Sequence, residues 1–339
     1  MSDDLEDVPP STMLDIYLQQ RRDEVSKQTL QSHEYRIRPF VEWCEENGIY
    51  SMSDLSGMDL HEFRIHRRED DDLKTITLQG QLSTLRQFLR VAASVEAVPE
   101  NLHEKILLPT VPKADQANEE MLETAQAQAA LEYLAQYKYA SRIHVELLIL
   151  WRTSMRRGGL RALDLGDFDP DEPALQVRHR PESDTPLKNG EWSNRDVYLL
   201  DRVAEVIQDY IDGPRVEIVD EHNRAPLLTT RQGRVAVGTI KQDMYRATRP
   251  CKYGVECPHD RDPDECDAAN PRQASKCPSS RSPHAIRTGS VTAHLDSGTP
   301  KPFLGDRVDM TEETMEQHYD QAGERERMLR RREYISEDV

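Results

Sequence analysis

Long apolar segments are absent from this sequence of 339 residues. The longest uninterrupted apolar run is 147–151, far short of the roughly 20 residues that a membrane-spanning helix needs. Residues 1–10 include four acidic residues and lack the apolar stretch of a signal peptide. We therefore expect a soluble, cytoplasmic protein without a membrane partner.

Basic charge is also in deficit, with 44 Lys and Arg against 62 Asp and Glu and a net charge of −18. Such a balance repels nucleic acid at ordinary ionic strength. Lysine is scarcer still, since it supplies only 10 of the 44 basic residues. Abundant carboxylate with little lysine favours a halophilic protein over an ordinary acidic cytosolic one. Molar salt shortens the Debye length to about 3 Å, so local arginine clusters become more informative than net charge.

The first third of the chain is predicted to be helical. Ile37, Phe40, Val41 and Cys44 follow one helical stripe, and a second stripe covers 82–92 after Thr75, which we expect to cap that helix. Pro109, Pro112 and the polar residues after them indicate a linker. The predicted parts are a disordered acidic tail at 1–11, a helical domain at 12–110, a linker at 111–121 and a second domain at 122–339.

The second domain mixes helices with a few strands. Two β-like runs, 175–178 and 196–199, flank the turn residues 188–190 and predict a hairpin. Helical patterns precede the hairpin at 143–151 and follow it at 203–211, and Ser282-Pro283 opens another helix. The expected fold class is mostly α with a small antiparallel β-sheet.

Arginine is concentrated just before the hairpin, at Arg152, Arg156, Arg157 and Arg161, with no acid among them. A guanidinium donates two parallel hydrogen bonds to a phosphate, and the glycine pair at 158–159 would allow a close backbone approach. The segment therefore predicts a phosphate-binding site. A solvated helix face with surface ion pairs is the alternative.

Two further segments carry chemically useful side chains. On the helix that begins at Pro283, His284 and Arg287 are three residues apart, so both could touch one phosphate. Imidazole transfers protons near neutral pH, while arginine stabilises charge on phosphoryl oxygens. Near the end of the chain, Tyr319 lies in the segment 318–320 after a helix that we expect to begin at Glu312.

Taken in order, these segments resemble the tyrosine recombinase (phage integrase) family. The resemblance implies a SAM-like core-binding domain at 12–110 that clamps DNA, and a tyrosine recombinase catalytic domain at 122–339. The segments that carry it are TSMRRGGLRALDLGDFD at 153–169, LKNGEWSNRDVYL at 187–199, PHAIRTGSVTAHLDSG at 283–298 and HYD at 318–320. Matched residue by residue, they imply the catalytic residues Arg156, Lys188, His284, Arg287 and Tyr319. Arg157 competes with Arg156 for the first position, and Tyr334 is the alternative nucleophile.

The resemblance implies a site-specific recombinase that acts on double-stranded DNA as a homotetramer. Tyr319 would form a 3′-phosphotyrosine, Arg156 and Arg287 would neutralise the transition state, Lys188 would protonate the leaving oxygen and His284 would assist. This chemistry needs no cofactor. A DNA-binding protein with impaired catalysis on the same scaffold, and a type IB topoisomerase, remain the alternatives.

Some positions depart from the family pattern. Gly159 stands where the family has an acid that braces the site, and Thr288-Gly289 replaces the usual His-Thr. The Leu-Gly-His block ends here in Asp306, which cannot donate a hydrogen bond when ionised. The sixth catalytic position is therefore open among Asp306, Arg307 and His318.

Cysteine is rare except in one insertion at 250–278. Because cytosolic disulfides are uncommon, clustered thiols in a segment with few apolar residues predict a structural Zn²⁺ site. Its candidate ligands are Cys251, Cys257, His259, Cys266 and Cys277. Reduced thiols on a loop are the alternative, and Cys44 is expected in the core.

Overall fold

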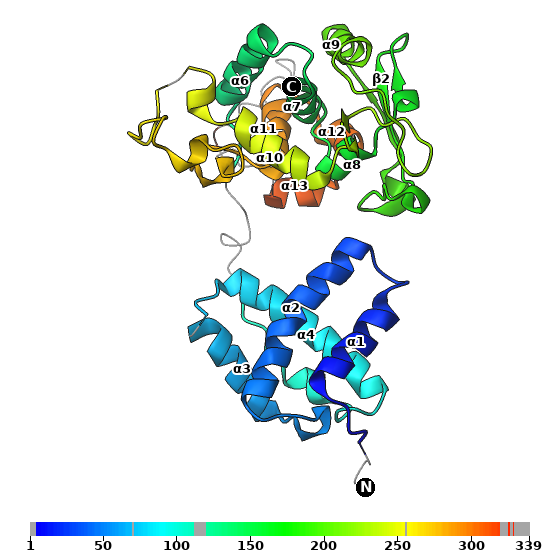
Figure 1. The fold of residues 1–339 in the computed structure, drawn as a ribbon, viewed down its shortest axis with the longest axis vertical. Helices are drawn as coiled ribbons and strands as arrows, with labels where there is room; N and C mark the ends of the chain where they lie inside the picture. The colour runs from blue at the N-terminus through cyan, green and yellow to red at the C-terminus, as the bar shows by residue number, and fades with distance from the viewer. Residues whose placement is uncertain are drawn as a thin grey trace, which may run out of the picture. The chain divides into compact units, whose positions relative to one another are not determined.

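The computed structural model describes residues 5–69, 71–111, 120–254 and 256–318, together with residues 325 and 328. The chain divides into two compact units, Met1–Ala117 and Asn118–Val339 (Figure 1). Within the described residues, no helix combines the length and apolar character that a bilayer crossing requires.

The first unit packs its helices around one apolar core. Its main helices are α1 (Pro10–Arg21), α2 (Lys27–Glu46), α3 (Gly57–Glu69) and α4 (Thr75–Ser94). Phe40 of α2 is fully buried and makes edge contacts with Phe63 and Phe88, whose helices it joins. Both predicted stripes face this core, which confirms the helical assignments. The expected cap is off by one residue, because Lys74 precedes the helix and Thr75 is its first residue.

The structure differs from the disordered tail predicted at 1–11, because residues in the second half of that segment make ordered contacts. The amide of Glu6 donates to the carbonyl of Glu96, and that of Met52 donates to the carbonyl of Val8. Pro10 is buried and begins α1. These contacts order the described residues before the first helix, whereas residues 1–4 lie outside the described part of the chain.

The second unit is built around α7, a helix that is buried along almost its whole length. Helices α6, α9, α10 and α11 contact it, and the short α8 follows it directly (Figure 1). These helices are α6 (Thr124–Tyr137), α7 (Arg142–Thr153), α8 (Arg157–Ala162), α9 (Asp201–Asp212), α10 (Val237–Ala247) and α11 (Pro283–Asp296). Apolar side chains of α7 such as Leu147, Ile149 and Leu150 are fully buried.

A three-stranded antiparallel sheet packs at one side of this unit. Its strands are β1 (Phe168–Asp169), β2 (Ala174–Val177) and β3 (Arg195–Tyr198). Leu175 pairs with Val197, and both side chains are buried. The predicted hairpin is thus confirmed, and Gly190 in its connection takes the left-handed backbone that glycine favours. A second ribbon, β4 (Thr229–Thr230) with β5 (Gly233–Arg234), was not anticipated.

Two short helices, α12 (Lys301–Val308) and α13 (Glu312–His318), follow α11. A small apolar cluster ties the three together through Val291, Leu295, Leu304, Val308 and Met315. At the other side of α11, the amide of Leu122 donates to the carbonyl of Ala285. A Cβ at Gly289 would lie 2.0 Å from the carbonyl oxygen of Leu122, so only glycine permits this close approach.

Candidate DNA-cleavage site

Arg156 stands at the corner between α7 and α8. Ser154 ends α7 in the left-handed conformation, and Arg156 is the extended residue immediately before α8. This backbone reversal separates the clustered arginines: Arg161 pairs with Asp184 at 3.0 Å, whereas Arg156 turns toward the hairpin connection and α12. The arginine cluster in the sequence therefore does not form a single basic patch.

The side chain of Arg156 meets the carboxylate of Asp309. Arg156 Nη1 lies 2.5 Å from Asp309 Oδ2, and Ser193 Oγ donates to the same oxygen at 2.7 Å. Asn189 Nδ2 is 3.1 Å from Oδ1 and 3.3 Å from Oδ2. The carboxylate of Asp309, the residue after α12, thus links this residue to the start of α8 and to the hairpin connection.

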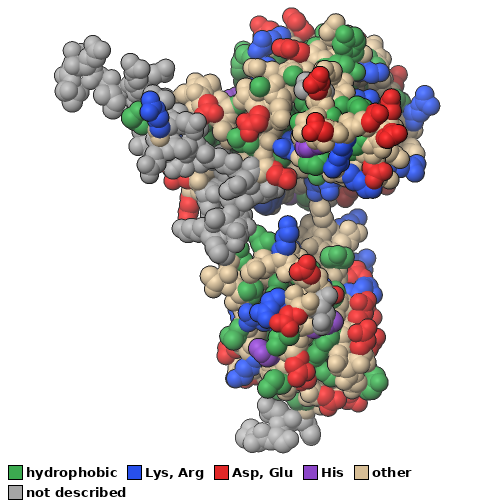
Figure 2. All heavy atoms as spheres, turned by 90° about the vertical axis from the view of Figure 1, so that its left-hand side faces the viewer, with side chains coloured by type: hydrophobic (Ala, Val, Ile, Leu, Met, Phe, Trp, Pro, Cys, Tyr) green, Lys and Arg blue, Asp and Glu red, His purple; other side chains and the backbone are tan. Residues whose placement is uncertain are grey.

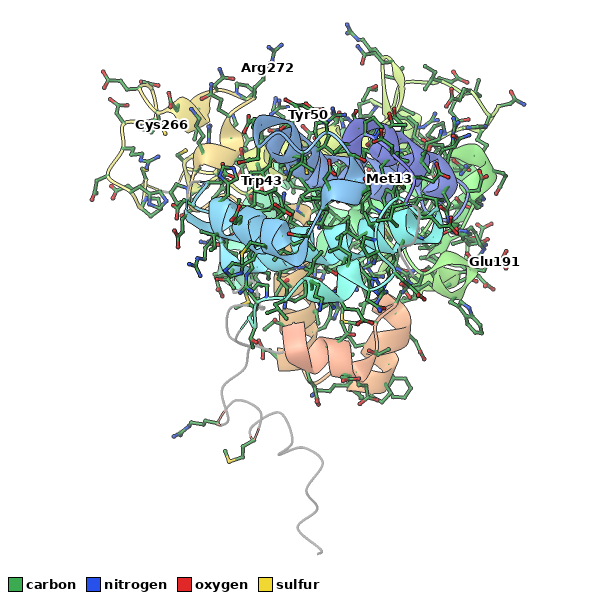
Figure 3. All side chains as sticks on the ribbon, turned by 90° about the horizontal axis from the view of Figure 1, so that it is seen from below. Met13, Trp43, Tyr50, Glu191, Cys266 and Arg272 are labelled. Atoms are coloured by element: carbon green, nitrogen blue, oxygen red, sulfur yellow. The ribbon has the colours of Figure 1, made fainter. Side chains whose placement is uncertain are left out.

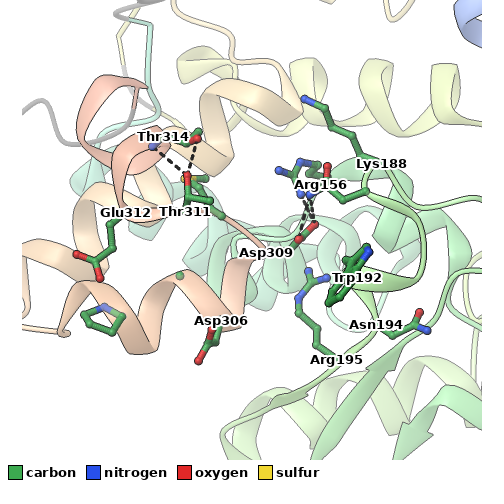
Figure 4. A pocket seen from close by; sticks show the side chains of 14 residues that line it. Arg156, Lys188, Trp192, Asn194, Arg195, Asp306, Asp309, Thr311, Glu312 and Thr314 are labelled. Atoms are coloured by element: carbon green, nitrogen blue, oxygen red, sulfur yellow. Dashed lines mark hydrogen bonds and ion pairs between the residues drawn. The ribbon is translucent and has the colours of Figure 1, made fainter.

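Arg156, Asn189 and Asp309 line a cavity of about 870 Å³ (Figure 4). Lys188 and Trp192 of the hairpin connection line it, together with Arg195 of β3. The opposite wall comes from α12 and the beginning of α13, and includes Asp306 and Glu312. The cavity therefore brings Arg156 and Lys188, two of the predicted catalytic residues, into one space.

Two guanidinium groups around this cavity are desolvated. Burial lowers the pKa of Arg195; the charge of Asp309 opposes that shift, and the charges of Arg156 and Arg307 add to it. Burial also lowers the pKa of Arg307, which donates from Nη2 to the carbonyl of Arg152 at 3.1 Å. Such desolvated guanidinium groups favour the entry of an anion.

The pKa of Asp309 is displaced in the opposite sense, toward the charged form. Burial by itself raises it, but hydrogen bonds from Ser193 and Asn189 and the charges of Arg156 and Arg195 outweigh burial and lower it. Asp309 is therefore ionised near neutral pH and is held by its donors.

Arg287 lies directly behind this corner. It is only 2% exposed and donates from Nη2 to the carbonyl of Val308 at 2.9 Å, and from Nη1 to the carbonyl of Ser154. Ser154 lies two residues before Arg156, and Val308 immediately precedes Asp309. His284, one turn earlier on α11, is exposed. The two members of the H-x-x-R pair thus differ sharply in burial.

The predicted nucleophile cannot be placed. Tyr319 lies outside the described residues, as does the alternative Tyr334. Its neighbour His318 ends α13, but the side chain of His318 is not described. Helix α13 begins at the cavity wall with Glu312 and ends at His318. Of the other candidates for the sixth position, Asp306 lines the cavity and Arg307 is partly buried.

Four residues of this site were missed by the sequence analysis: Asn189, Ser193, Arg195 and Asp309. The first three lie within the hairpin segment that had been singled out for Lys188, so a polar hairpin connection was the available signal. Asp309 gave no comparable signal, because it is separated from Arg156 by 153 positions.

A second arginine cluster in the same unit contrasts with this site. Arg224 and Arg234 both bind Asp164 at 2.5 Å, and Arg234 also binds Asp220 at 2.7 Å. Arg180 donates to Asp167 at 2.8 and 2.5 Å. Three guanidinium groups therefore face three carboxylates. The hydrogen bond to Asp167 raises the pKa of Arg180 and outweighs the effect of burial.

The cysteine insertion does not form the predicted metal site. Cys251, Cys257, Cys266 and Cys277 are all free, and the ring of His259 is hydrogen-bonded to Ser279 at 2.9 Å. Among the described residues, which include all five candidates, no group of three or more His, Cys, Asp or Glu side chains is arranged to hold a metal ion.

The insertion is ordered instead by its own contacts. Arg249 donates to the carbonyl of Ala268, Ser280 donates to that of Ala274, and both alanines are fully buried. Cys266 and Arg272 lie on loops that project from the helices of their unit (Figure 3). The expectation that metal was needed to order this segment is therefore not supported.

On the face shown in Figure 2, acidic and basic side chains are interspersed in both units.

Comparison with known proteins supplies relatives for both units. Residues 14–95 match the family described as phage integrase, N-terminal SAM-like domain. The structure of the N-terminal domain of a phage integrase/site-specific recombinase from Haloarcula marismortui is 35% identical to this chain, covering 31% of this chain and 99% of that one, with a TM-score of 0.30. No curated protein sequence matches the chain.

Two solved structures resemble nearly the whole chain. The Tn1549 transposon integrase in complex with a circular intermediate DNA is 17% identical, with a TM-score of 0.64 over 95% of this chain and 99% of that one. A lambda integrase dimer bound to a COC′ core site is 13% identical, with a TM-score of 0.63 over 94% of this chain and 79% of that one.

Proposed function

Because the chain belongs to the tyrosine recombinase (phage integrase) family, we propose that it is a site-specific recombinase that cleaves and rejoins double-stranded DNA through a 3′-phosphotyrosine intermediate. The observation that supports this most is the cavity in which Arg156 and Lys188 meet, with Arg287 directly behind Arg156. The Tn1549 and lambda integrases are recorded in complex with DNA, which supports DNA as the partner here.

The proposed reaction begins when a backbone phosphate enters the cavity. The Tyr319 phenol attacks phosphorus, a bond forms to its oxygen, and the 5′-oxygen of the next nucleotide leaves. Arg156 and Arg287 stabilise the charge on the non-bridging oxygens, while Lys188 gives a proton to the leaving oxygen. His284 assists proton transfer. Attack by a 5′-hydroxyl reverses the step, so rejoining needs no ATP.

Full recombination requires two DNA sites and four active sites. We propose that the protein assembles as a homotetramer on these sites, each protomer contributing one Tyr319. The helical unit containing α1 to α4 serves as the DNA clamp, as its match to the integrase SAM-like domain suggests.

A covalent trapping assay tests the proposal. The full-length protein is incubated with a nicked suicide DNA substrate, at low salt and in molar KCl, and DNA-linked protein is detected on denaturing gels. We expect a covalent complex with the wild type and with Tyr334→Phe, and none with Tyr319→Phe. A complex that persists in Tyr319→Phe, or none from the wild type at either salt concentration, would contradict the proposal.

The second candidate is a DNA-binding protein with weak or no catalysis on the same scaffold. Asp309 on Arg156 and the exposed Asp306 in the cavity wall favour it, because both carboxylates oppose the entry of a phosphate. Sequence-dependent DNA binding without a covalent complex at either salt concentration would support this second function.

A further inference from the structure

The carboxylate of Asp309 is bound by donors that suit any oxyanion. A guanidinium (Arg156), a hydroxyl (Ser193) and a side-chain amide (Asn189) approach its two oxygens at 2.5 to 3.3 Å. All three can donate, and none of these contacts depends on the acceptor being a carboxylate. Phosphate oxygens accept the same charge-assisted hydrogen bonds.

We propose that Arg156, Asn189 and Ser193 form a phosphate-binding site, and that Asp309 occupies it as an internal anion until a backbone phosphate of DNA displaces it. This inference rests on the proposed function, because it names the ligand and the regulation of that same site. It assigns Asn189 and Ser193 a direct role in binding phosphate, and makes Asp309 an autoinhibitory residue.

The surroundings of Asp309 favour exchange of one anion for another. Lys188, Arg195 and Arg156 line the same cavity as the carboxylate, and of the acids Asp306, Asp309 and Glu312 in that lining it is Asp309 that pairs with Arg156. Trp192, which also lines the cavity, is 93% exposed, so the space is open to a large ligand. A phosphate that enters would meet donors already directed at one point.

The backbone at Asp309 is suited to release. Asp309 has a φ of 54°, in the left-handed region that a residue with a side chain adopts at a cost in free energy. It lies between α12, of eight residues, and α13, of seven. A change confined to this junction can withdraw the carboxylate without disturbing α8 or the hairpin.

An internal ligand weakens the apparent affinity for an external one. If the site is open in only a fraction of molecules, the apparent dissociation constant rises by the inverse of that fraction. Removing the carboxylate therefore tightens the binding of a free anion. Removing a donor weakens it, whether or not Asp309 is present.

Calorimetric titration of the full-length protein with inorganic phosphate tests this inference. We expect Asp309→Asn to bind phosphate about tenfold more tightly than the wild type. Asp309→Gly should do the same, and because glycine favours this backbone it guards against a folding defect in the Asn variant. Adding Ser193→Ala to Asp309→Asn should cancel most of the gain.

The matched control is Glu312→Gln, which removes one negative charge from the wall of the same cavity. We expect its phosphate affinity to stay within about twofold of the wild type, because Coulombic effects across solvated space are weak. Equal gains in Glu312→Gln and Asp309→Asn would overturn the inference, as would unchanged affinity in both Asp309 variants.

This titration contains no DNA and does not use Tyr319, so its outcome is independent of the trapping assay. Tight phosphate binding by Asp309→Asn without any covalent complex would support the phosphate site while contradicting the recombinase proposal. A covalent complex together with unchanged phosphate affinity would do the reverse.

Discussion

The two arginine clusters of the second unit use the same side chain for opposite purposes. Around Asp164, guanidinium groups and carboxylates are equal in number, and hydrogen bonding raises the pKa of Arg180. Around Asp309, the cavity lining also holds three cations and three carboxylates, but Asp309 pairs with Arg156, and burial lowers the pKa of Arg195 and Arg307. A cluster whose guanidinium groups are held by carboxylates stabilises the fold, whereas one with desolvated guanidinium groups is able to accept an outside anion.

Removing an acid from the balanced cluster should have the largest effect on stability. Asp164→Ala leaves Arg234, whose side chain is 5% exposed, with one ion pair fewer, and leaves Arg224 without its carboxylate partner. We expect a loss of about 3–5 kcal/mol in the free energy of unfolding, measured by urea denaturation. Asp184→Ala breaks the exposed pair with Arg161 and serves as the control, with a loss of at most about 1 kcal/mol. Similar losses in both variants would erase the distinction between the clusters.

Removing a cation from the cluster around Asp309 should instead affect catalysis. We expect Arg156→Ala to slow covalent-complex formation by about 10²–10³-fold, because it removes transition-state stabilisation. The free energy of unfolding should change by no more than about 1 kcal/mol. Arg161→Ala, in the adjoining helix, is the matched control and should retain most of the rate. A large loss of stability in Arg156→Ala would show that this cluster stabilises the fold, as the cluster around Asp164 does.

A third buried cluster sharpens the comparison, because a nearby cation does not guarantee that a buried carboxyl group is ionised. Glu146 is fully buried, 2.8 Å from Arg142, which also contacts Asp243 at 2.9 Å. Burial raises the pKa of Glu146 to about 8, and the attraction of Arg142 offsets this only partly. The folded protein therefore holds a proton that the unfolded chain releases near pH 4.5.

This raised pKa gives the sign of a pH dependence. Protonated Glu146 makes its full contribution to the free energy of unfolding below pH 4.5. This contribution is lost as the pH rises through about 8. Between pH 6 and pH 9 we expect a loss of about 2–3 kcal/mol in urea denaturation. Glu146→Gln should remove this loss, whereas Glu132→Gln, at an exposed position of α6, should retain it. An unchanged slope in Glu146→Gln would mean that another group carries the proton.

The smallest expected effect is on tryptophan quenching, which tests whether the cavity around Asp309 faces DNA. Trp192 lines the cavity and is 93% exposed, while Trp43 and Trp151 are each 6% exposed. Acrylamide should quench mainly Trp192, and duplex DNA should protect it because a duplex bound at the cavity would cover the indole ring that lines it. Trp192→Phe should abolish the protected fraction. Unchanged quenching on adding DNA would show that the cavity does not face the bound DNA.

The helices and the hairpin could be predicted because their signals are local. The stripe from Ile37 to Cys44 needs only the helical period, and Ser282 before Pro283 marks the start of α11 with a side chain that caps it. The Arg156–Asp309 contact could not be predicted in this way. It joins positions 153 apart, and it depends on the left-handed residue that ends α12. The zinc prediction rests on cysteine spacing alone, and such spacing does not report whether thiols converge in space.

The close approach at Gly289 constrains more than its own helix. The chain enters the second unit by seating the backbone of Leu122 against the bare Cα of Gly289, on the helix that also carries Arg287. Any larger residue at 289 must push that entry point aside by more than an ångström, since ordinary contacts of a Cβ lie beyond about 3.4 Å. A side chain at position 289 would therefore separate the backbone at Leu122 from the helix that carries Arg287.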